Sequence, residues 1–227
     1  MNNLAAVVAY WASVIAATLF VIFIASFAGI AMASPLFVWT NLSHYVSYTS
    51  AHSQVFKHIA QTSMLLFGPA FVVLVGCIHE NASASQKVLT RIALGFAVIF
   101  ATLIGMHYFV QISAVRMNLS KGQVDGIEQF LQGKPDSAMS AINMLGWTLF
   151  FGLSSLFVAP VFGGERIQKW IRFLFVLNGV CCLLAGIGYV TENVAVVFLT
   201  INLGMGGCVT ILSFLLAAHF RQILKEN

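Results

Sequence analysis

The sequence predicts an all-α, polytopic integral membrane protein, a bundle of about six transmembrane helices in one domain covering residues 1–227. Hydrophobic residues make up 59% of the 227 residues and charged residues only 8%. Soluble domains average about 45–50% apolar and about 25% charged residues. A soluble protein so poor in charge could not cover its surface, so we expect lipid to be its solvent.

The second observation is the length of the apolar runs, because a helix needs about 20 mainly apolar residues to cross a bilayer. Six runs meet this length. They cover residues 8–33, 60–78, 92–115, 141–162, 171–190 and 194–220. Their uniform apolar character excludes a membrane β-barrel, whose strands are shorter and alternate in polarity.

Two details refine these spans. Pro69 follows Gly68 in the second run, and we expect a kink there, which bilayers tolerate when neighbouring helices satisfy the freed backbone groups. Only residues 191–193 separate the last two runs, which predicts a tight antiparallel hairpin.

The first run ends in Ala31-Met32-Ala33, which resembles a signal-peptidase site. The apolar stretch before it is far longer than the hydrophobic part of a signal peptide, and no Lys or Arg precedes it. We therefore expect the first run to be retained as a span, with Ser34 emerging on the outer face.

The loops predict the direction of the chain, because cytoplasmic loops are enriched in Lys and Arg. With the N-terminus inside, seven basic residues lie on the inner side and four on the outer side. This favours a bacterial-type plasma (inner) membrane with both termini in the cytoplasm. The inner residues are Lys87, Arg91, Arg166, Lys169, Arg172, Arg221 and Lys225, and the outer residues are Lys57, Arg116, Lys121 and Lys134.

Two longer segments then lie outside. Residues 34–59 are amphipathic and carry Trp39, Tyr45 and Tyr48, so we expect them to lie along the membrane interface, where aromatic residues anchor. Residues 116–140 are rich in glycine and contain Pro135, which predicts a loop with one short helix at most.

Polar residues recur on single faces of the predicted helices, since residues three, four and seven apart share a face. Such residues usually point into a helix bundle. They predict an outward-facing polar and aromatic pocket that binds or passes a small amphiphilic ligand. The residues are His107, Gln111, Asn143, Trp147, Asn178, Tyr189, Glu192 and Asn202. Asn178 and Asn202 lie deepest and would form its floor.

A purely structural interpretation stays open for these residues. Asparagines often form hydrogen bonds between packed membrane helices, at about 0.6 kcal/mol each. Glu192 lies in the short turn at 191–193, where it can simply face water.

Several functional classes are disfavoured. None of the seven acidic residues lies in the middle of a span, which argues against an ion-coupled transporter. The sequence has no HExxH, GxSxG or P-loop motif, so an enzyme is the less favoured reading and no cofactor is predicted. No dense basic cluster indicates a nucleic-acid partner.

A metal- or haem-dependent membrane enzyme or electron carrier is the first alternative. His58, His107 and Glu192 have the donor types of a catalytic zinc site. A b-type haem needs two facing histidines, and the pairs His58 with His107 or His79 with His219 would supply them.

The second alternative is a structural subunit of a membrane complex or a homo-oligomer. Small residues let membrane helices approach closely, and Ala25, Gly29 and Ala33 follow one face of the first span. The four cysteines all lie in apolar runs, so we expect buried thiols. They are Cys77, Cys181, Cys182 and Cys208.

Overall fold

The computed structural model describes residues 3–226, of which no residue forms a strand, and the chain is 85% helical. Six helices are long and apolar enough to cross a membrane, which confirms the predicted fold class. They cover Leu4–Ala33, Val55–Asn81, Ala84–Ser120, Ala138–Val161, Arg166–Val190 and Val194–Glu226.

Several of these long helices are composite. The uninterrupted ones are α1 (Asn3–Ala33), α3 (Val55–Asn81) and α8 (Arg166–Val190). The third contains α4 (Lys87–Val110) and α5 (Arg116–Ser120), the fourth α6 (Ala138–Leu145) and α7 (Phe151–Val158), and the sixth α9 (Val194–Val197) and α10 (Gly206–Glu226). Short 3₁₀ turns occur at Ala84–Gln86, Ile127–Phe130 and Ala159–Val161.

The helices begin and end beyond the apolar runs where polar caps extend them. The third helix begins at Ala84 rather than at residue 92. Ser83 and Gln86 form a capping box there, in which Gln86 Oε1 accepts from the Ser83 backbone N–H at 3.4 Å. A hydropathy pattern does not register such a polar first turn.

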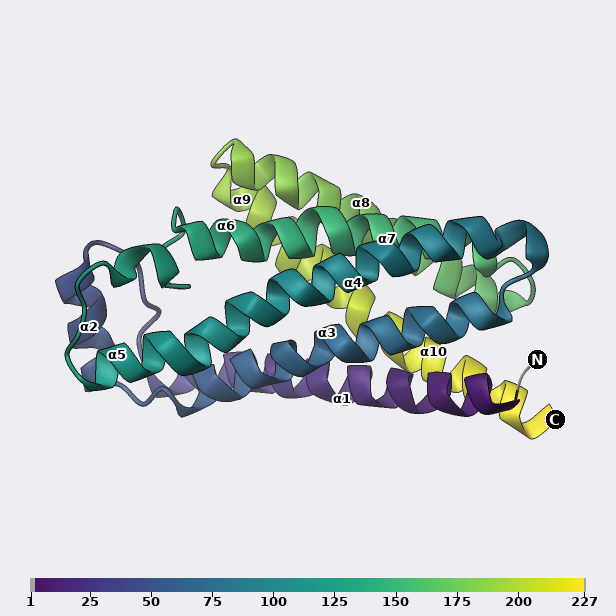
Figure 1. Ribbon diagram of the computed structural model, residues 1–227, viewed down its shortest axis with the longest axis horizontal. Helices are drawn as coiled ribbons and strands as arrows, with labels where there is room; N and C mark the ends of the chain where they lie inside the picture. Colours follow the sequence, from purple (N-terminus) through teal and green to yellow (C-terminus); the bar gives the residue numbers. More distant parts are fainter. Residues whose placement is uncertain (1–2, 227) are drawn as a thin grey trace.

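The six long helices run along one another in a bundle (Figure 1), and their contacts close a ring. Helix α1 packs against α3 and α10, α3 against α4, α4 against α7, α7 against α8, and α8 against α10. Helix α1 begins and α10 ends at one end of the bundle, which we call the terminal end. The opposite end carries α2 (Leu42–Ala51), and we call it the capped end.

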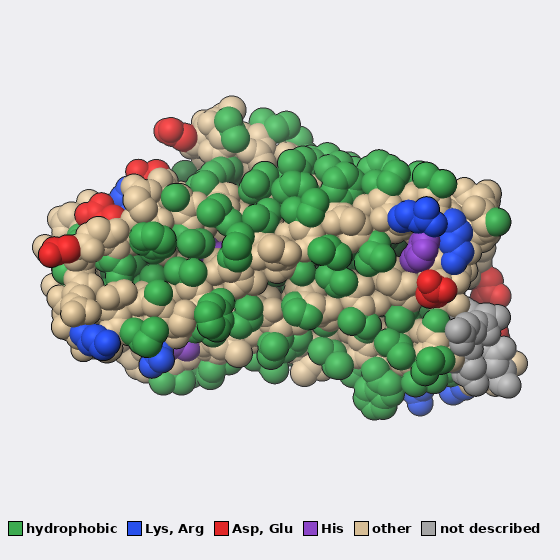
Figure 2. Space-filling model, viewed as in Figure 1, with side chains coloured by type: hydrophobic (Ala, Val, Ile, Leu, Met, Phe, Trp, Pro, Cys, Tyr) green, Lys and Arg blue, Asp and Glu red, His purple; other side chains and the backbone are tan. Residues whose placement is uncertain are grey.

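The surface matches this arrangement. On the face shown in Figure 2, hydrophobic side chains cover the middle of the molecule, and the charged side chains gather at its two ends. Large apolar side chains such as Trp11, Ile24 and Phe173 are about half exposed, at 57%, 46% and 53%. A band of this kind suits lipid as the solvent.

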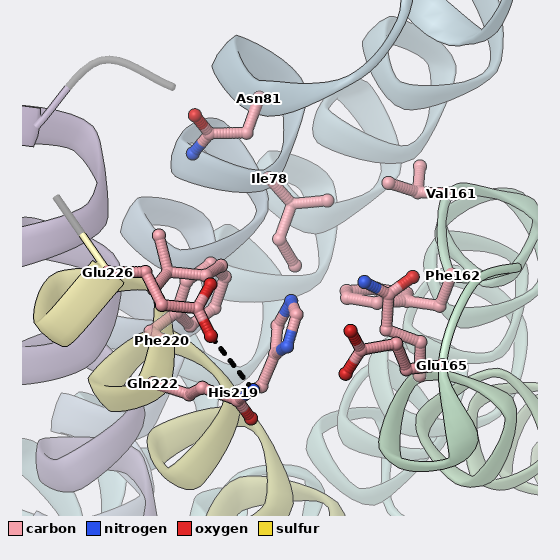
Figure 3. A pocket seen from close by; sticks show the side chains of 11 residues that line it. Ile78, Asn81, Val161, Phe162, Glu165, His219, Phe220, Gln222 and Glu226 are labelled. Atoms are coloured by element: carbon pink, nitrogen blue, oxygen red, sulfur yellow. Dashed lines mark hydrogen bonds between the residues drawn. The ribbon is translucent and has the colours of Figure 1, made fainter.

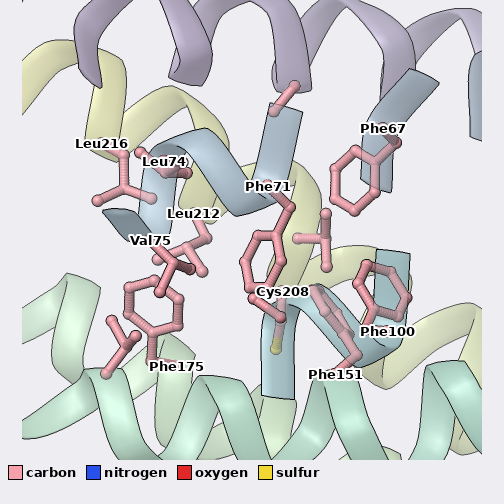
Figure 4. Close-up of a cluster of buried hydrophobic side chains, with 14 of the residues drawn as sticks. Phe67, Phe71, Leu74, Val75, Phe100, Phe151, Phe175, Cys208, Leu212 and Leu216 are labelled. Atoms are coloured by element: carbon pink, nitrogen blue, oxygen red, sulfur yellow. The ribbon is translucent and has the colours of Figure 1, made fainter. Parts of the chain in front are cut away.

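Aromatic side chains fill the centre of the ring (Figure 4). The ring centroids of Phe100 and Phe151 lie 4.7 Å apart, and those of Phe71 and Phe151 lie 4.8 Å apart. Trp147 lies 4.9 Å from Phe100 and also contacts Phe67. This aromatic cluster separates the capped end from the terminal end.

Three of the long helices contain a π-helical segment. These segments are Gln111–Val115, Gly146–Phe150 and Phe198–Met205. Each lies closer to the capped end of its helix. A π segment shifts the angular phase of the residues around it, and such segments are frequent at functional sites.

The two segments predicted to lie outside pack onto each other. Tyr45 of α2 is only 2% exposed and forms a small second core with Val115, Ile127 and Leu131. Asn41 caps α2, since its Oδ1 accepts from the His44 backbone N–H at 2.9 Å. Helix α2 therefore covers the end of the bundle, and the expectation that residues 34–59 lie along the membrane interface stays a prediction.

Candidate ligand-binding site

The candidate site is centred on Lys57, in the first turn of α3. Its Nζ donates to the Tyr45 hydroxyl at 2.8 Å and lies 5.1 Å from the centre of the Tyr45 ring. Lys57 is half-buried, and within residues 3–226 the only ion pair is Lys134–Asp136. Lys57 is thus a half-buried cation without an acidic partner.

Lys134 differs sharply from Lys57. Its ammonium donates to Asp136 Oδ2 at 3.0 Å, and this hydrogen bond holds the pKa of the Asp136 carboxyl below its usual value. Both residues lie in the loop before α6. Asp136 is therefore engaged by Lys134, and no ion pair of Lys57 occurs among residues 3–226.

An aromatic cavity of about 250 Å³ lies on one side of Lys57. Lys57 is the one charged residue in its wall. Phe27 also lines the cavity and is 54% exposed, so the cavity borders the apolar surface of the bundle. Its lining residues are Phe23, Phe27, Ile30, Ser34, Phe37, Tyr45, Tyr48, Ser53, Gln54, Lys57, Ala60, Gln61, Tyr108, Gln132 and Gly133.

A polar cavity of about 260 Å³ lies on the other side. The two cavities share Gln54, Lys57 and Gln61. Arg116 adds a second cation to the polar cavity, and neither wall contains an acidic residue. The combined region therefore favours an anionic group near Lys57.

A chain of amides holds the wall between the cavities in place. His58 Nδ1 donates to Gln61 Oε1 at 3.1 Å, and Gln61 Nε2 donates to Gln132 Oε1 at 2.8 Å. Gln111 Nε2 donates to the Phe130 carbonyl at 2.5 Å, while its Oε1 accepts from the Gln132 backbone N–H at 3.2 Å. The loop around residue 132 is fixed in this way to α3 and to the π segment Gln111–Val115.

Two of the predicted site residues, Gln111 and His107, lie next to these cavities. Gln111 lines the polar cavity. His107 is fully buried, and its Nδ1 donates to the Met139 carbonyl at 3.0 Å, which makes Nδ1 the protonated nitrogen. Its Nε2 has no hydrogen-bond partner among the described residues.

Asn143 and Trp147 lie one layer further in. Both side chains interact with Tyr108, which lines the aromatic cavity. Trp147 belongs to the aromatic cluster, and Asn143 Oδ1 is buried without a partner in the part of the chain that is described. These residues support the wall of the aromatic cavity and do not line it.

The remaining four predicted residues lie apart from both cavities. Asn178 is buried between α7 and α8 and donates to Ser155 Oγ at 2.8 Å. Tyr189 donates to the Pro135 carbonyl at 2.8 Å and lines an apolar groove between α6 and α8. Glu192 is exposed in the turn after α8, with φ 56°.

Asn202 was expected at the floor of the pocket, and the structure does not place it there. It is exposed, and its Nδ2 donates to the Phe198 carbonyl of its own helix at 3.1 Å. The reason is the π segment Phe198–Met205. The assignment of Asn202 to the inner face assumed a rotation of 100° per residue along the whole span. A π segment changes that rotation locally, so Asn202 points elsewhere.

Of the histidines proposed for metal or haem, His58, His79 and His107 form hydrogen bonds within the protein. Across residues 3–226, no three His, Cys, Asp or Glu side chains converge as metal ligands, so His58, His107 and Glu192 are not brought together. His79 Nδ1 bonds to the Thr90 hydroxyl at 2.7 Å.

Sequence reasoning missed Lys57, Tyr45 and Gln132 as site residues. All three belong to the two segments outside the predicted spans or to the first turn beyond one. Their convergence depends on contacts between residues far apart in sequence, which helical periodicity cannot reveal. Comparison with protein-family models, curated proteins and solved structures finds no match.

Proposed function

We propose that the protein is a multi-pass plasma-membrane protein with both termini in the cytoplasm, and that it binds a small amphiphilic anion in the aromatic cavity from the outer side. The observation that carries this proposal is Lys57, a half-buried cation in a wall whose other described residues are aromatic, apolar or neutral polar. A buried charge is costly unless it is paired. An anionic ligand would supply the missing partner.

The cavity wall suits both parts of such a ligand. A carboxylate or phosphate would accept from Lys57 Nζ next to the Tyr45 hydroxyl. An acyl chain would lie against Phe23, Phe27 and Ile30 of α1 and reach the lipid past the exposed part of Phe27. Ligand pockets commonly combine apolar walls with a few polar groups in this manner.

Binding is better supported than passage across the membrane. Below the capped end, the rings of Phe67, Phe100, Trp147 and Phe151 pack within 4.7–6.4 Å of one another. Protein interiors packed at this density leave no continuous path for a solute.

The test is equilibrium binding of labelled dodecanoate to the protein in phosphatidylcholine nanodiscs, with empty nanodiscs as the blank. Lys57→Gln should weaken binding at least about tenfold, since hydrogen bonds to charged groups contribute about 1.5–3 kcal/mol. Lys121→Gln is the matched control, because Lys121 is exposed and outside both cavities.

Two further ligands sharpen the result. Dodecanol, which has no charge, should bind wild type and Lys57→Gln equally weakly. The affinity of dodecyl phosphate, compared with that of dodecanoate, shows whether the site prefers a phosphate or a carboxylate. Equal dodecanoate affinity in wild type and Lys57→Gln, or no saturable binding above empty nanodiscs, would contradict the proposal.

A further inference from the structure

A separate cavity of about 220 Å³ lies at the terminal end, on the far side of the aromatic cluster. It is formed where the end of α3, the start of α8 and the end of α10 meet (Figure 3). Apolar residues including Phe162 and Phe220 form part of its wall. It shares no lining residue with the aromatic or the polar cavity.

His219 of α10 points into this cavity (Figure 3). It is only 9% exposed, and its ring centroid lies 6.0 Å from that of Phe162 and 5.4 Å from that of Phe220. Neither ring nitrogen forms a hydrogen bond to another described residue. The imidazole is therefore available to a bound molecule.

The wall carries two acidic residues. Glu165 and Glu226 are the only Asp, Glu, Lys or Arg among its described residues, and neither forms an ion pair within residues 3–226. Glu226 Oε1 accepts from Gln222 Nε2 at 3.0 Å, as the dashed line in Figure 3 marks. Both carboxylates keep most of their capacity to accept hydrogen bonds.

Asn81 adds another acceptor from α3. Its Nδ2 donates to the Cys77 carbonyl at 2.9 Å, while its Oδ1 is buried and has no partner among the described side chains and backbone. Acceptors from α3, α8 and α10 thus surround one small space, and the protein supplies few donors to match them.

We propose that this acidic cavity binds a small organic cation, a primary ammonium group on an apolar or aromatic body. An ammonium group has three N–H donors for the Glu165 and Glu226 carboxylates and Asn81 Oδ1. Phe162 and Phe220 offer ring faces to the cation or stack on its aromatic body. A metal ion suits the cavity less well, since no three His, Cys, Asp or Glu side chains of residues 3–226 lie close enough to ligate one.

The experiment measures binding of 2-phenylethylammonium to the purified full chain in detergent by isothermal titration calorimetry near neutral pH. Wild type should bind it saturably, and Glu165→Gln or Glu226→Gln should each weaken binding about fivefold, as is typical for partly exposed charge pairs. The double variant should lose more than either single one. Both residues are exposed, so these variants should fold, which thermal unfolding checks.

Glu80→Gln is the matched control, because Glu80 is an exposed acid at the same end that does not line the cavity. It should bind as wild type does, and so should Lys57→Gln at the capped end. 2-Phenylethanol, the uncharged analogue, should bind more weakly than 2-phenylethylammonium, and its affinity should be the same for wild type and the glutamate variants. Absence of saturable binding to wild type, or full affinity in the double variant, would overturn the proposal.

Discussion

The crossing of α7 and α8 depends on two glycines that face each other, Gly152 and Gly179. A Cβ at Gly179 would lie 2.9 Å from the Gly152 carbonyl oxygen and would also collide with the Leu156 side chain. A Cβ at Gly152 would lie 2.9 Å from the Cys182 Cβ. Backbone atoms cannot turn aside as side chains can, so Gly179→Ala should force the two helices apart.

The size of the effect follows from two opposing contributions. Overpacking costs about 1–3 kcal/mol, while alanine gains about 0.5–1 kcal/mol over glycine inside a helix. The neighbouring hydrogen bond from Asn178 to Ser155 crosses the same interface, and losing it leaves a buried amide unpaired at about 1–3 kcal/mol. With the hydrogen bond lost as well, we expect a net loss of about 1–5 kcal/mol, which lowers the midpoint of thermal unfolding by roughly 2–20 °C in a chain of this size.

Thermal unfolding can be followed with a thiol-reactive dye, because Cys182 and Cys208 are buried and free. Gly95→Ala in α4 is the matched control, since a Cβ there meets nothing within 4 Å. Gly95→Ala should keep or raise the unfolding midpoint. If Gly179→Ala unfolded at the same temperature as Gly95→Ala, the close helix crossing would be refuted.

Three further predictions test other parts of the molecule. Phe100→Ala should destabilise the protein by about 3–5 kcal/mol, because Phe100 is 0% exposed in the aromatic cluster. Phe130→Ala should change the stability little, since Phe130 is 49% exposed. Equal midpoints of thermal unfolding for the two variants would contradict this prediction. The pKa of Asp136 is lowered, so its ionised form stabilises the folded protein above the ordinary pKa of about 4, and this stabilisation is lost as the pH falls further. The stability of Asp136→Asn should therefore fall slightly less steeply with decreasing pH than that of wild type. A membrane-impermeant maleimide should label Lys121→Cys in intact cells and Lys169→Cys only after permeabilisation; the reverse pattern would place both termini outside.

The six long helices could be predicted because their signal is local. Each apolar run is long enough by itself to specify a helix in lipid, and tertiary contacts are not needed to recognise it. Helix ends were less predictable. Ser83 and Gln86 begin the third helix through a hydrogen-bonded polar turn, which hydropathy cannot distinguish from a loop.

The candidate site was predictable only in kind. A polar and aromatic cavity does lie at the capped end, but of the eight residues predicted for the site only Gln111 lines either cavity there. Face assignments extend one helical period along a whole span, and they fail at a π segment, as Asn202 shows. Burial also does not identify a ligand-facing side chain, because Asn178 is buried against Ser155 and not in a cavity.

The chemistry of Lys57 bears on the binding that we propose at the capped end. An ammonium group has three N–H donors, and Tyr45 accepts one of them, while no second acceptor occurs among the residues described. The Tyr45 ring lowers the cost of burying the charge by cation–π attraction, which is worth about 0.5–2 kcal/mol. That attraction alone does not explain a charged residue there, since an apolar side chain would pack in the aromatic wall without any such cost. Two donors of Lys57 thus have no protein acceptor among the described residues, and an anionic ligand is the partner that we propose for them.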